Sequence, residues 1–309
     1  MPIATVVPEK FLTEPFHRHE LVAAGLSPKL LLGKRFQRVF PGVWKSVELA
    51  LTHAQVLTAA RKAMPARAGL SHISRIQDLG LDVGLHEPVH FTIAGDLHLD
   101  LDGIYLHRTA AMPPLRGNGV APAAAFIQCC STMALIEIVV IGDWLLHEGH
   151  MTIPELKHMI QRQKWRPGAK QARKVIRFLD PASRSPQESR LRMCIIMSGL
   201  PAPEVNADVF DSAGRRVAIV DLYFRAWRLV LEYEGRQHAE SARQFQRDID
   251  RYRDLRRLHV EYLQVTAAML AQPKALMLSV YHRLSELGFS GPAPEFGTRW
   301  LGLFRPIPL

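Results

Sequence analysis

The chain has 309 residues, of which 48% are hydrophobic and 22% are charged. This composition excludes a wholly disordered chain, a collagen and a simple fibre, and the length favours about two domains. Lys and Arg total 39 against 29 Asp and Glu, which gives a net charge of +10 and a pI of about 9.8. A surplus of this size favours a polyanionic partner, nucleic acid first and an anionic membrane surface second.

The cysteines and the apolar segments point to a cytoplasmic protein. Cys129, Cys130 and Cys194 form no Cys-x-x-Cys pair, which argues against a zinc knuckle and a disulfide framework. We therefore expect three buried thiols in a reducing compartment. The N-terminal residues include no apolar signal segment. The apolar stretch 133–146 is too short to span a bilayer and carries two acids, so it predicts a buried helix and no membrane partner.

Residues 1–83 follow the order of a winged helix-turn-helix. A short helix over 19–24 ends at Gly25, and Ser27 caps a second helix, Pro28–Arg35. Two strands then flank a Pro41-Gly42 turn, and a helix follows over 51–63. The expected DNA contacts are basic residues of the second helix and the wing: Lys29, Lys34, Arg35, Arg38 and Lys45. The alternative is a plain pair of helices that makes no DNA contact.

Residues 84–182 predict an α+β middle domain. Strands over 89–93 and 104–107 pair around a polar loop, and helices follow over 122–146, 153–161 and 170–179. Residues 157–192 hold eleven Lys or Arg and two acids. This local basic surplus favours a role in holding a DNA duplex.

Residues 183–309 predict a third domain with the order αβββαβα. An antiparallel meander followed by a helical crossover gives a mixed sheet with helices on both faces. The expected elements are a helix over 185–198, strands over 205–210, 216–224 and 228–234, a charged helix over 241–258, a strand over 259–265 and a helix over 272–287. The charged helix alternates acids with arginines, so it is first of all a solvated helix.

Three acids of this third domain are candidates for a metal site. Asp221 lies in a strand that is apolar on both faces, where an unpaired carboxylate is unfavourable by several kcal/mol. Glu232 and Glu234 share one face of the next strand, about 6.6 Å apart along it. If the two strands pair, the carboxylates converge, and Mg²⁺ or Mn²⁺ is the cation that suits such oxygen ligands. Gly235 then allows a turn that brings His238 close by.

Four motifs in this order carry a resemblance to a known family. They are Ser185-Pro-Gln-Glu188-Ser, Val220-Asp221, Glu232-x-Glu234-Gly235-x-x-His238 and Arg247-Asp248-x-x-Arg251. About residues 183–270 resemble the endonuclease-like domain related to very-short-patch repair endonucleases, within the PD-(D/E)xK superfamily. The N-terminal block resembles the winged-helix domain of AbiEi-type antitoxins, through residues 21–44 and Leu70-Ser71-His72.

The resemblance implies a restriction-endonuclease-like αβββαβ core and a role for each motif residue. Asp221 and Glu232 would hold the metal, with the carbonyl of Tyr233 as a third ligand. Glu188 would be an outer or second-site ligand, and His238 would transfer a proton. Glu234 occupies the position of the superfamily's lysine, so no lysine activates water, and Gln264 stands where relatives commonly carry arginine.

Two functions follow as expectations. The first is a DNA-binding protein whose C-terminal domain is a Mg²⁺- or Mn²⁺-dependent endodeoxyribonuclease. The second is a catalytically silent relative that binds DNA as a transcriptional regulator or antitoxin, the latter with a toxin partner. Four of the five site residues also have a structural alternative: Glu188 as a helix cap with Ser185, Asp221 paired with an arginine, and Glu234 and His238 as solvated residues.

Overall fold

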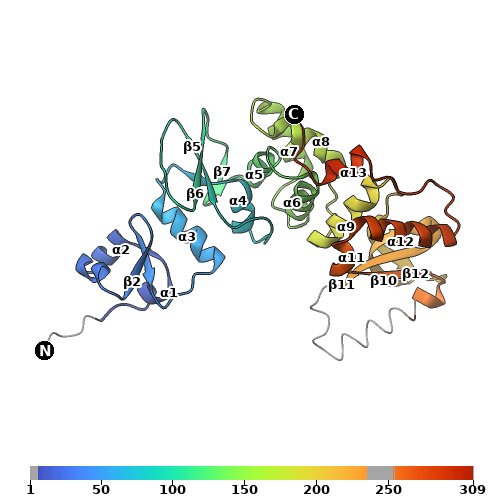
Figure 1. Ribbon diagram of the computed structural model, residues 1–309, viewed down its shortest axis with the longest axis horizontal. Helices are drawn as coiled ribbons and strands as arrows, with labels where there is room; N and C mark the ends of the chain where they lie inside the picture. Colours follow the sequence, from blue (N-terminus) through green and yellow to red (C-terminus); the bar gives the residue numbers. More distant parts are fainter. Residues whose placement is uncertain (1–5, 235–252, 254, 309) are drawn as a thin grey trace. The chain divides into compact units, whose positions relative to one another are not determined.

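The computed structural model describes residues 6–234, 253 and 255–308 (Figure 1). These residues build three separate β-sheets among many helices, so the expected multidomain α/β class is confirmed in this coarse form. The chain divides into two compact units, unit 1 (residues 1–125) and unit 2 (residues 126–309).

Unit 1 begins with a three-stranded sheet of order β1-β3-β2. Phe16 packs edge to face against both Phe11 and Phe36, and Leu21 and Leu31 complete the small core. The elements are α1 (Lys10–Thr13), β1 (Phe16–His17), α2 (Arg18–Ala23), the 3-10 helix η1 (Pro28–Leu32), β2 (Phe36–Phe40), β3 (Val43–Ser46) and α3 (His53–Ala63).

The second predicted helix of this region is shorter and tighter than expected. Ser27 caps it by accepting a hydrogen bond from the N–H of Lys29, as the sequence indicates. The segment is a 3-10 helix that ends at Leu32, because Gly33 adopts an extended conformation. The expected helix over 28–35 is therefore wrong in length and in type.

The second sheet of unit 1 has five strands in the order β6-β5-β4-β8-β7. The two strands expected over 89–93 and 104–107 are present as β5 and β6. They pair in parallel, and Val89 lies opposite Ile104. The elements are β4 (Gly69–Leu70), α4 (His72–Asp78), β5 (Val89–Ala94), β6 (Ile104–Thr109), β7 (Leu115–Arg116) and β8 (Gly119–Val120), and α5 (Pro122–Cys129) then crosses from unit 1 into unit 2.

Unit 2 opens with helices. The single helix expected over 122–146 is two helices, α5 and α6, because the chain turns at 130–134. Ser131 donates its hydroxyl to the carbonyl of Gln128, a local hydrogen bond that competes with a continuous helix. The helices up to the sheet are α6 (Leu135–His147), α7 (Ile153–Arg162), α8 (Ala169–Val175), the 3-10 helix η2 (Ile176–Phe178) and α9 (Pro186–Met197).

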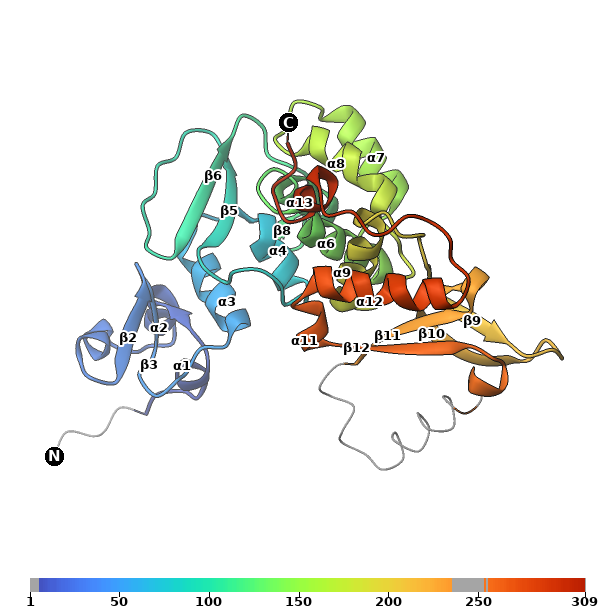
Figure 2. The same cartoon turned by 45° about the vertical axis from the view of Figure 1, so that its right-hand side comes forward.

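A four-stranded mixed sheet follows, with the order β12-β11-β10-β9. Strands β9, β10 and β11 form an antiparallel meander, and β12 joins β11 in parallel. Figure 2 shows α9 and α12 on one face of this sheet. The elements are β9 (Glu204–Phe210), β10 (Arg216–Phe224), the 3-10 helix η3 (Arg225–Trp227), β11 (Leu229–Glu234), β12 (Glu261–Thr266), α11 (Ala267–Leu270), α12 (Pro273–Glu286) and α13 (Thr298–Leu303).

The helix expected over 241–258 lies mostly outside the described residues. Its described part, Arg253 and Leu255–Arg257, is helical, and Leu255 is buried in one core cluster with Val220 and Val230 of the sheet. The three cysteines are buried and free, as expected. Within the described part of the chain, no helix has both the length and the apolar character needed to cross a bilayer.

A buried ion pair joins α6 to α9. Asp143 accepts hydrogen bonds from the guanidinium of Arg192 at 2.7 Å, the hydroxyl of Ser189 at 2.8 Å and the N–H of Asp180 at 2.7 Å. Both side chains of the ion pair are less than a tenth exposed. Because α9 covers the mixed sheet, this ion pair fixes the sheet against the helices of unit 2.

Asp143→Ala is expected to lower the free energy of unfolding by about 3–5 kcal/mol, because it leaves the buried Arg192 without its anion. Arg225→Ala is the control, since it breaks an exposed ion pair with Glu204 and is expected to lose no more than about 1 kcal/mol. Urea unfolding followed by tryptophan fluorescence measures both. Equal losses in the two variants would contradict the structural role of the Asp143–Arg192 pair.

Candidate functional site

One row of side chains runs across the mixed sheet and contains the predicted acids of β10 and β11. Because Leu222 pairs with Leu231, the register places Asp221 directly opposite Glu232. Glu232 in turn pairs with Gln264 of β12. On the other side, the pairing of Val220 with Ala207 and of Leu222 with Val205 places Asn206 opposite Asp221. The row is therefore Asn206, Asp221, Glu232 and Gln264.

The two central carboxylates have defined surroundings. Glu232 is 5% exposed, and the hydroxyl of Tyr262 lies 3.4 Å from its Oε2. Asp221 is half-buried and accepts a hydrogen bond from the N–H of Tyr233 at 3.0 Å. Directly opposed residues of antiparallel strands have Cβ atoms about 4.5–5.5 Å apart. Two carboxylates at that separation repel one another unless a cation or a proton compensates.

This donor set fits a hard divalent cation. Asp221 and Glu232 offer carboxylate oxygens, the ligands preferred by Mg²⁺ and Mn²⁺. The described residues include no group of three that contains both acids and has all ligand atoms within metal-binding range. Two carboxylates are nevertheless enough for Mg²⁺, which usually keeps several waters in its coordination sphere.

Glu188 is tied to the same row through Asn206. Its Oε2 accepts hydrogen bonds from the amide of Asn206 at 2.7 Å and from the N–H of Arg184 at 2.9 Å. The N–H of Glu188 donates to the hydroxyl of Ser185, so the residue also belongs to the N-terminal cap of α9. The structural alternative considered for Glu188 is thus present. Asn206 itself has a φ of +46°, which is rare for a non-glycine residue.

Among the other residues of the predicted site, the structure describes only Glu234. Glu234 is half-buried at the end of β11, where it pairs with Thr266. His238 lies outside the described residues, as does the motif Arg247-Asp248-x-x-Arg251. The register therefore brings together Asp221, Glu232 and, through Asn206, Glu188.

The basic residues predicted to contact DNA lie in unit 1, on η1 (Lys29), in the turn before β2 (Lys34 and Arg35) and on β2 and β3 (Arg38 and Lys45). Lys29, Lys34, Arg35 and Arg38 are exposed. Lys34 and Arg35 line a hollow of about 400 Å³. Lys45 is half-buried and donates its ammonium to the carbonyl of Leu49 at 2.6 Å, so it is directed back to its own loop.

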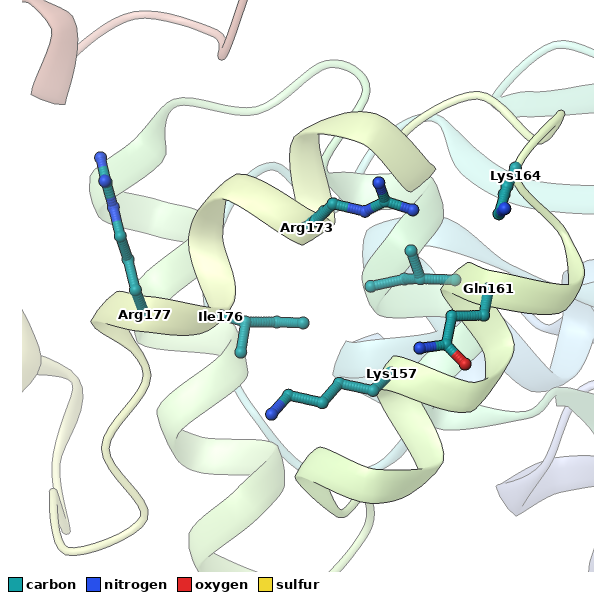
Figure 3. Close-up of a pocket in the computed structure, with 7 residues that line it drawn as sticks. Lys157, Gln161, Lys164, Arg173, Ile176 and Arg177 are labelled. Atoms are coloured by element: carbon teal, nitrogen blue, oxygen red, sulfur yellow. The ribbon is translucent and has the colours of Figure 1, made fainter.

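A second basic hollow lies between helices of unit 2. It has a volume of about 930 Å³ and is lined by Lys157, Ile160, Gln161, Lys164, Arg173, Ile176 and Arg177, with no acid among them. Figure 3 shows Lys157 and Gln161 of α7 facing Arg173 and Ile176 across the hollow, while Arg177 points away. Trp165, in the loop after α7, is 57% exposed and stacks on the guanidinium of Arg166. An exposed aromatic ring next to lysine and arginine side chains suits a nucleic acid.

A histidine triad in unit 1 was not anticipated from the sequence. His72, His90 and His107 have ligand atoms that all lie within 4.8 Å of one another. Alternation along β5 and β6 places His90 and His107 on the face opposite the core residues Phe91 and Leu106, and the sequence carried this signal. The third member depends on β4, which has two residues and therefore no recognisable periodicity.

Two proteins from two strains of Mycobacterium tuberculosis, both described as uncharacterized, are similar to part of this chain. Each is 25% identical over 159 residues, which cover 50% of this chain and 58% of the relative. The chain thus spans little more than half the length of these relatives. No model of a known protein family matches the chain, and no solved structure matches it.

The contacts of Glu188 predict different effects for two substitutions. Glu188→Gln keeps an oxygen that can accept from Asn206 and Arg184, so we expect the free energy of unfolding to change by less than about 1 kcal/mol. Glu188→Ala leaves both donors without this acceptor and is expected to lose about 1–3 kcal/mol. Urea unfolding of both variants checks this. Similar losses for Gln and Ala would mean that the charge itself holds the fold together.

Proposed function

We propose that the chain binds double-stranded DNA and hydrolyses its phosphodiester bonds with Mg²⁺ or Mn²⁺ held by Asp221 and Glu232. The observation that carries this proposal is the register of β10 and β11, which sets the two carboxylates opposite one another in a mixed sheet. The order α9, β9, β10, β11 and β12 supports a restriction-endonuclease-like core. The three free, buried cysteines suit a cytoplasmic location, which is part of the proposal.

Each residue of the row has a role in this proposal. Asp221 and Glu232 bind the cation, which supplies Lewis-acid catalysis of the hydrolysis. The N–H of Tyr233 orients Asp221, and the hydroxyl of Tyr262 lies beside Glu232. Asn206 holds the carboxylate of Glu188 next to this pair. Glu234 is an acid where a lysine would orient the attacking water, so water activation depends on the cation and on His238.

The basic surfaces supply the affinity for DNA. Phosphate groups bind Lys and Arg side chains with release of counterions, and this term dominates non-specific binding. The hollow lined by Lys157 and Arg173 and the one lined by Lys34 and Arg35 both present such groups. The exposed ring of Trp165 adds a surface on which an unpaired base can stack.

A DNA-binding regulator or antitoxin without catalytic activity is the second candidate, the antitoxin with a toxin partner. Two features of unit 2 favour it. Glu188 already has a structural use as part of the α9 cap, and Glu234 replaces a cationic group by an anionic one. The same basic surfaces would then bind DNA while the carboxylate pair has no catalytic role.

Asp221→Asn is expected to abolish Mn²⁺-dependent DNA cleavage while the affinity for DNA stays unchanged, because the carboxylate binds the cation and not the phosphates. Asp208→Asn is the matched control, since Asp208 lies on the neighbouring strand in an exposed ion pair with Arg216. Cleavage of linear, supercoiled and mismatched duplexes with and without EDTA measures the activity, and gel shift measures the affinity.

Three outcomes separate the candidates. Cleavage by the wild type and by Asp208→Asn, absent in Asp221→Asn, supports the nuclease. Equal cleavage by Asp221→Asn shows that the site lies elsewhere. Binding of all duplexes without any cleavage by the wild type contradicts the nuclease and favours the regulator or antitoxin.

The salt dependence of DNA binding tests both basic surfaces. Removing two phosphate contacts is expected to reduce the slope of log K against log salt by about 1 per contact. We expect this reduction for the double variant Lys34→Ala/Arg35→Ala and for Lys157→Ala/Arg173→Ala. The double variant Lys274→Ala/Arg305→Ala removes the same charge from other exposed positions and should leave the slope unchanged. An equal reduction in all three would show that only net charge matters.

A further inference from the structure

Three histidines from separate segments of unit 1 converge beside the edge of its five-stranded sheet. Nδ1 of His90 lies 2.9 Å from Nε2 of His107. The rings of His72 and His107 stack at 3.7 Å with an interplanar angle of 18°, and those of His72 and His90 lie 5.6 Å apart. Each side chain offers one ring nitrogen, and the three nitrogens are at most 4.8 Å apart.

The strand pairing explains why these three residues meet. In the parallel pair β5–β6, His90 lies opposite Tyr105 and Thr92 opposite His107, so the two histidines are diagonal neighbours. Two-residue alternation places them on the same face. His72 is separated by Ser71 alone from the end of β4, whose Leu70 pairs with Phe91 of β5. Three adjacent segments thus deliver one imidazole each.

The backbone around the triad is held in place from both sides. The N–H of Ser71 donates to the carbonyl of His90 at 2.9 Å, and the N–H of His90 donates to the hydroxyl of Ser74 at 2.9 Å. The hydroxyl of Ser71 lies 3.0 Å from Nδ1 of His72. A hydrogen bond at one ring nitrogen is what fixes the tautomer and the orientation of metal-bound imidazoles.

His72 also has an unusual backbone conformation. Its φ of +50° lies in the left-handed region, which non-glycine residues rarely adopt. Strained residues of this kind cluster at binding and catalytic sites, where surrounding contacts hold them. Here the conformation occurs at the first residue of α4, at the residue that brings the third imidazole to the strand pair.

From this geometry we infer that His72, His90 and His107 form a Zn²⁺ site with three imidazole ligands and a fourth position open to water. Imidazole is a ligand of borderline softness that suits Zn²⁺ better than Mg²⁺ or Mn²⁺, which prefer oxygen. Three protein ligands with an exchangeable fourth ligand are typical of open zinc sites, whereas structural sites are closed by four protein ligands. This site is independent of the proposed carboxylate pair in unit 2.

The protonation state of the triad is the one that a metal requires. Burial lowers the pKa of His72 to about 2 and that of His107 to about 4, and it also lowers the pKa of His90. The neighbouring histidines lower the pKa of His72 and His107 further. A metal binds the neutral form of imidazole, so these surroundings do not oppose coordination, which the geometry of the three rings supports.

Binding requires a small rearrangement of the rings. With Zn–N distances of about 2.0–2.1 Å, tetrahedral ligand nitrogens lie about 3.3 Å apart. The nitrogens of His90 and His107 have to separate slightly from 2.9 Å, because the metal replaces the proton between them. The stacked rings of His72 and His107 have to tilt, since a metal lies in the plane of each imidazole that it binds.

The open fourth position follows from the exposure of this edge. His90 and His107 are only partly buried, and the ring of Tyr105 lies 4.5 Å from that of His107. Tyr105 is 54% exposed, so solvent reaches this side of the triad. No cysteine or acid joins the three histidines in the described part of the chain to close the site.

The test is Zn²⁺ binding by the full chain after removal of metals with a chelator. Competition with a chromophoric chelator gives the affinity and stoichiometry, and Co²⁺ in place of Zn²⁺ gives a visible d–d spectrum. We expect each wild-type chain to bind one zinc ion at the histidine triad. His107→Ala should weaken it by at least about 100-fold, whereas His107→Cys, which supplies another zinc ligand, should retain it. Azide should change the Co²⁺ spectrum by entering the fourth position.

His86→Ala is the matched control. His86 stacks on His53 at 3.9 Å within the same unit, so this variant removes a stacked histidine outside the triad. It should bind zinc as the wild type does. Circular dichroism without metal verifies that His107→Ala is folded, and His90→Ala provides a second test if it is not. Unchanged affinity in both triad variants, an equal loss in His86→Ala, or no zinc binding by the wild type would overturn the proposal.

Discussion

The free energy required to bury ionisable side chains is the constraint on which both units depend. A buried carboxylate or imidazole is tolerated only when hydrogen bonds, an ion pair or a change of protonation compensates for lost hydration. Asp143 is compensated by Arg192 and two further donors, and this arrangement locks α6 to α9. For the histidine triad, the unfavourable free energy of burying a charge is avoided in another way, because burial favours the neutral form of each imidazole.

The same constraint separates structural acids from acids with a proposed chemical role. The contacts of Asp143 and Glu188 are those of residues that join helices and strands. Asp221 and Glu232 instead lie opposite one another on the paired strands β10 and β11, and the proposed metal site rests on this register. Glu188 links the structural acids to the proposed metal-binding acids. Its carboxylate accepts a hydrogen bond from Asn206, which lies in the same row as Asp221.

The sequence predicted the strands of unit 2 closely because their composition is distinctive. The expected strand over 216–224 coincides with β10, and that over 228–234 differs from β11 by one residue. β-Branched and apolar runs bounded by turn residues carry enough information for this. The presence of Asp221 and Glu232 on paired strands was likewise predictable, since two-residue alternation fixes the face of each side chain.

Features that depend on pairing between distant segments were not predictable. The break between α5 and α6 was missed for a different reason, since it is accompanied by a single local hydrogen bond from Ser131 to Gln128. The row through Asn206 requires the register of β9, and the triad requires the two-residue strand β4. Neither short strands nor a positive φ at Asn206 or His72 leaves a periodic trace in the sequence.

The most direct measurement of the central claim is the position of Mn²⁺ in crystals of the full chain, located by its anomalous scattering. A manganese ion bound by the carboxylates of Asp221 and Glu232 is the expected result. Crystals soaked with Mn²⁺ that show these two side chains without any ion between them would contradict the assignment of a catalytic metal to this sheet.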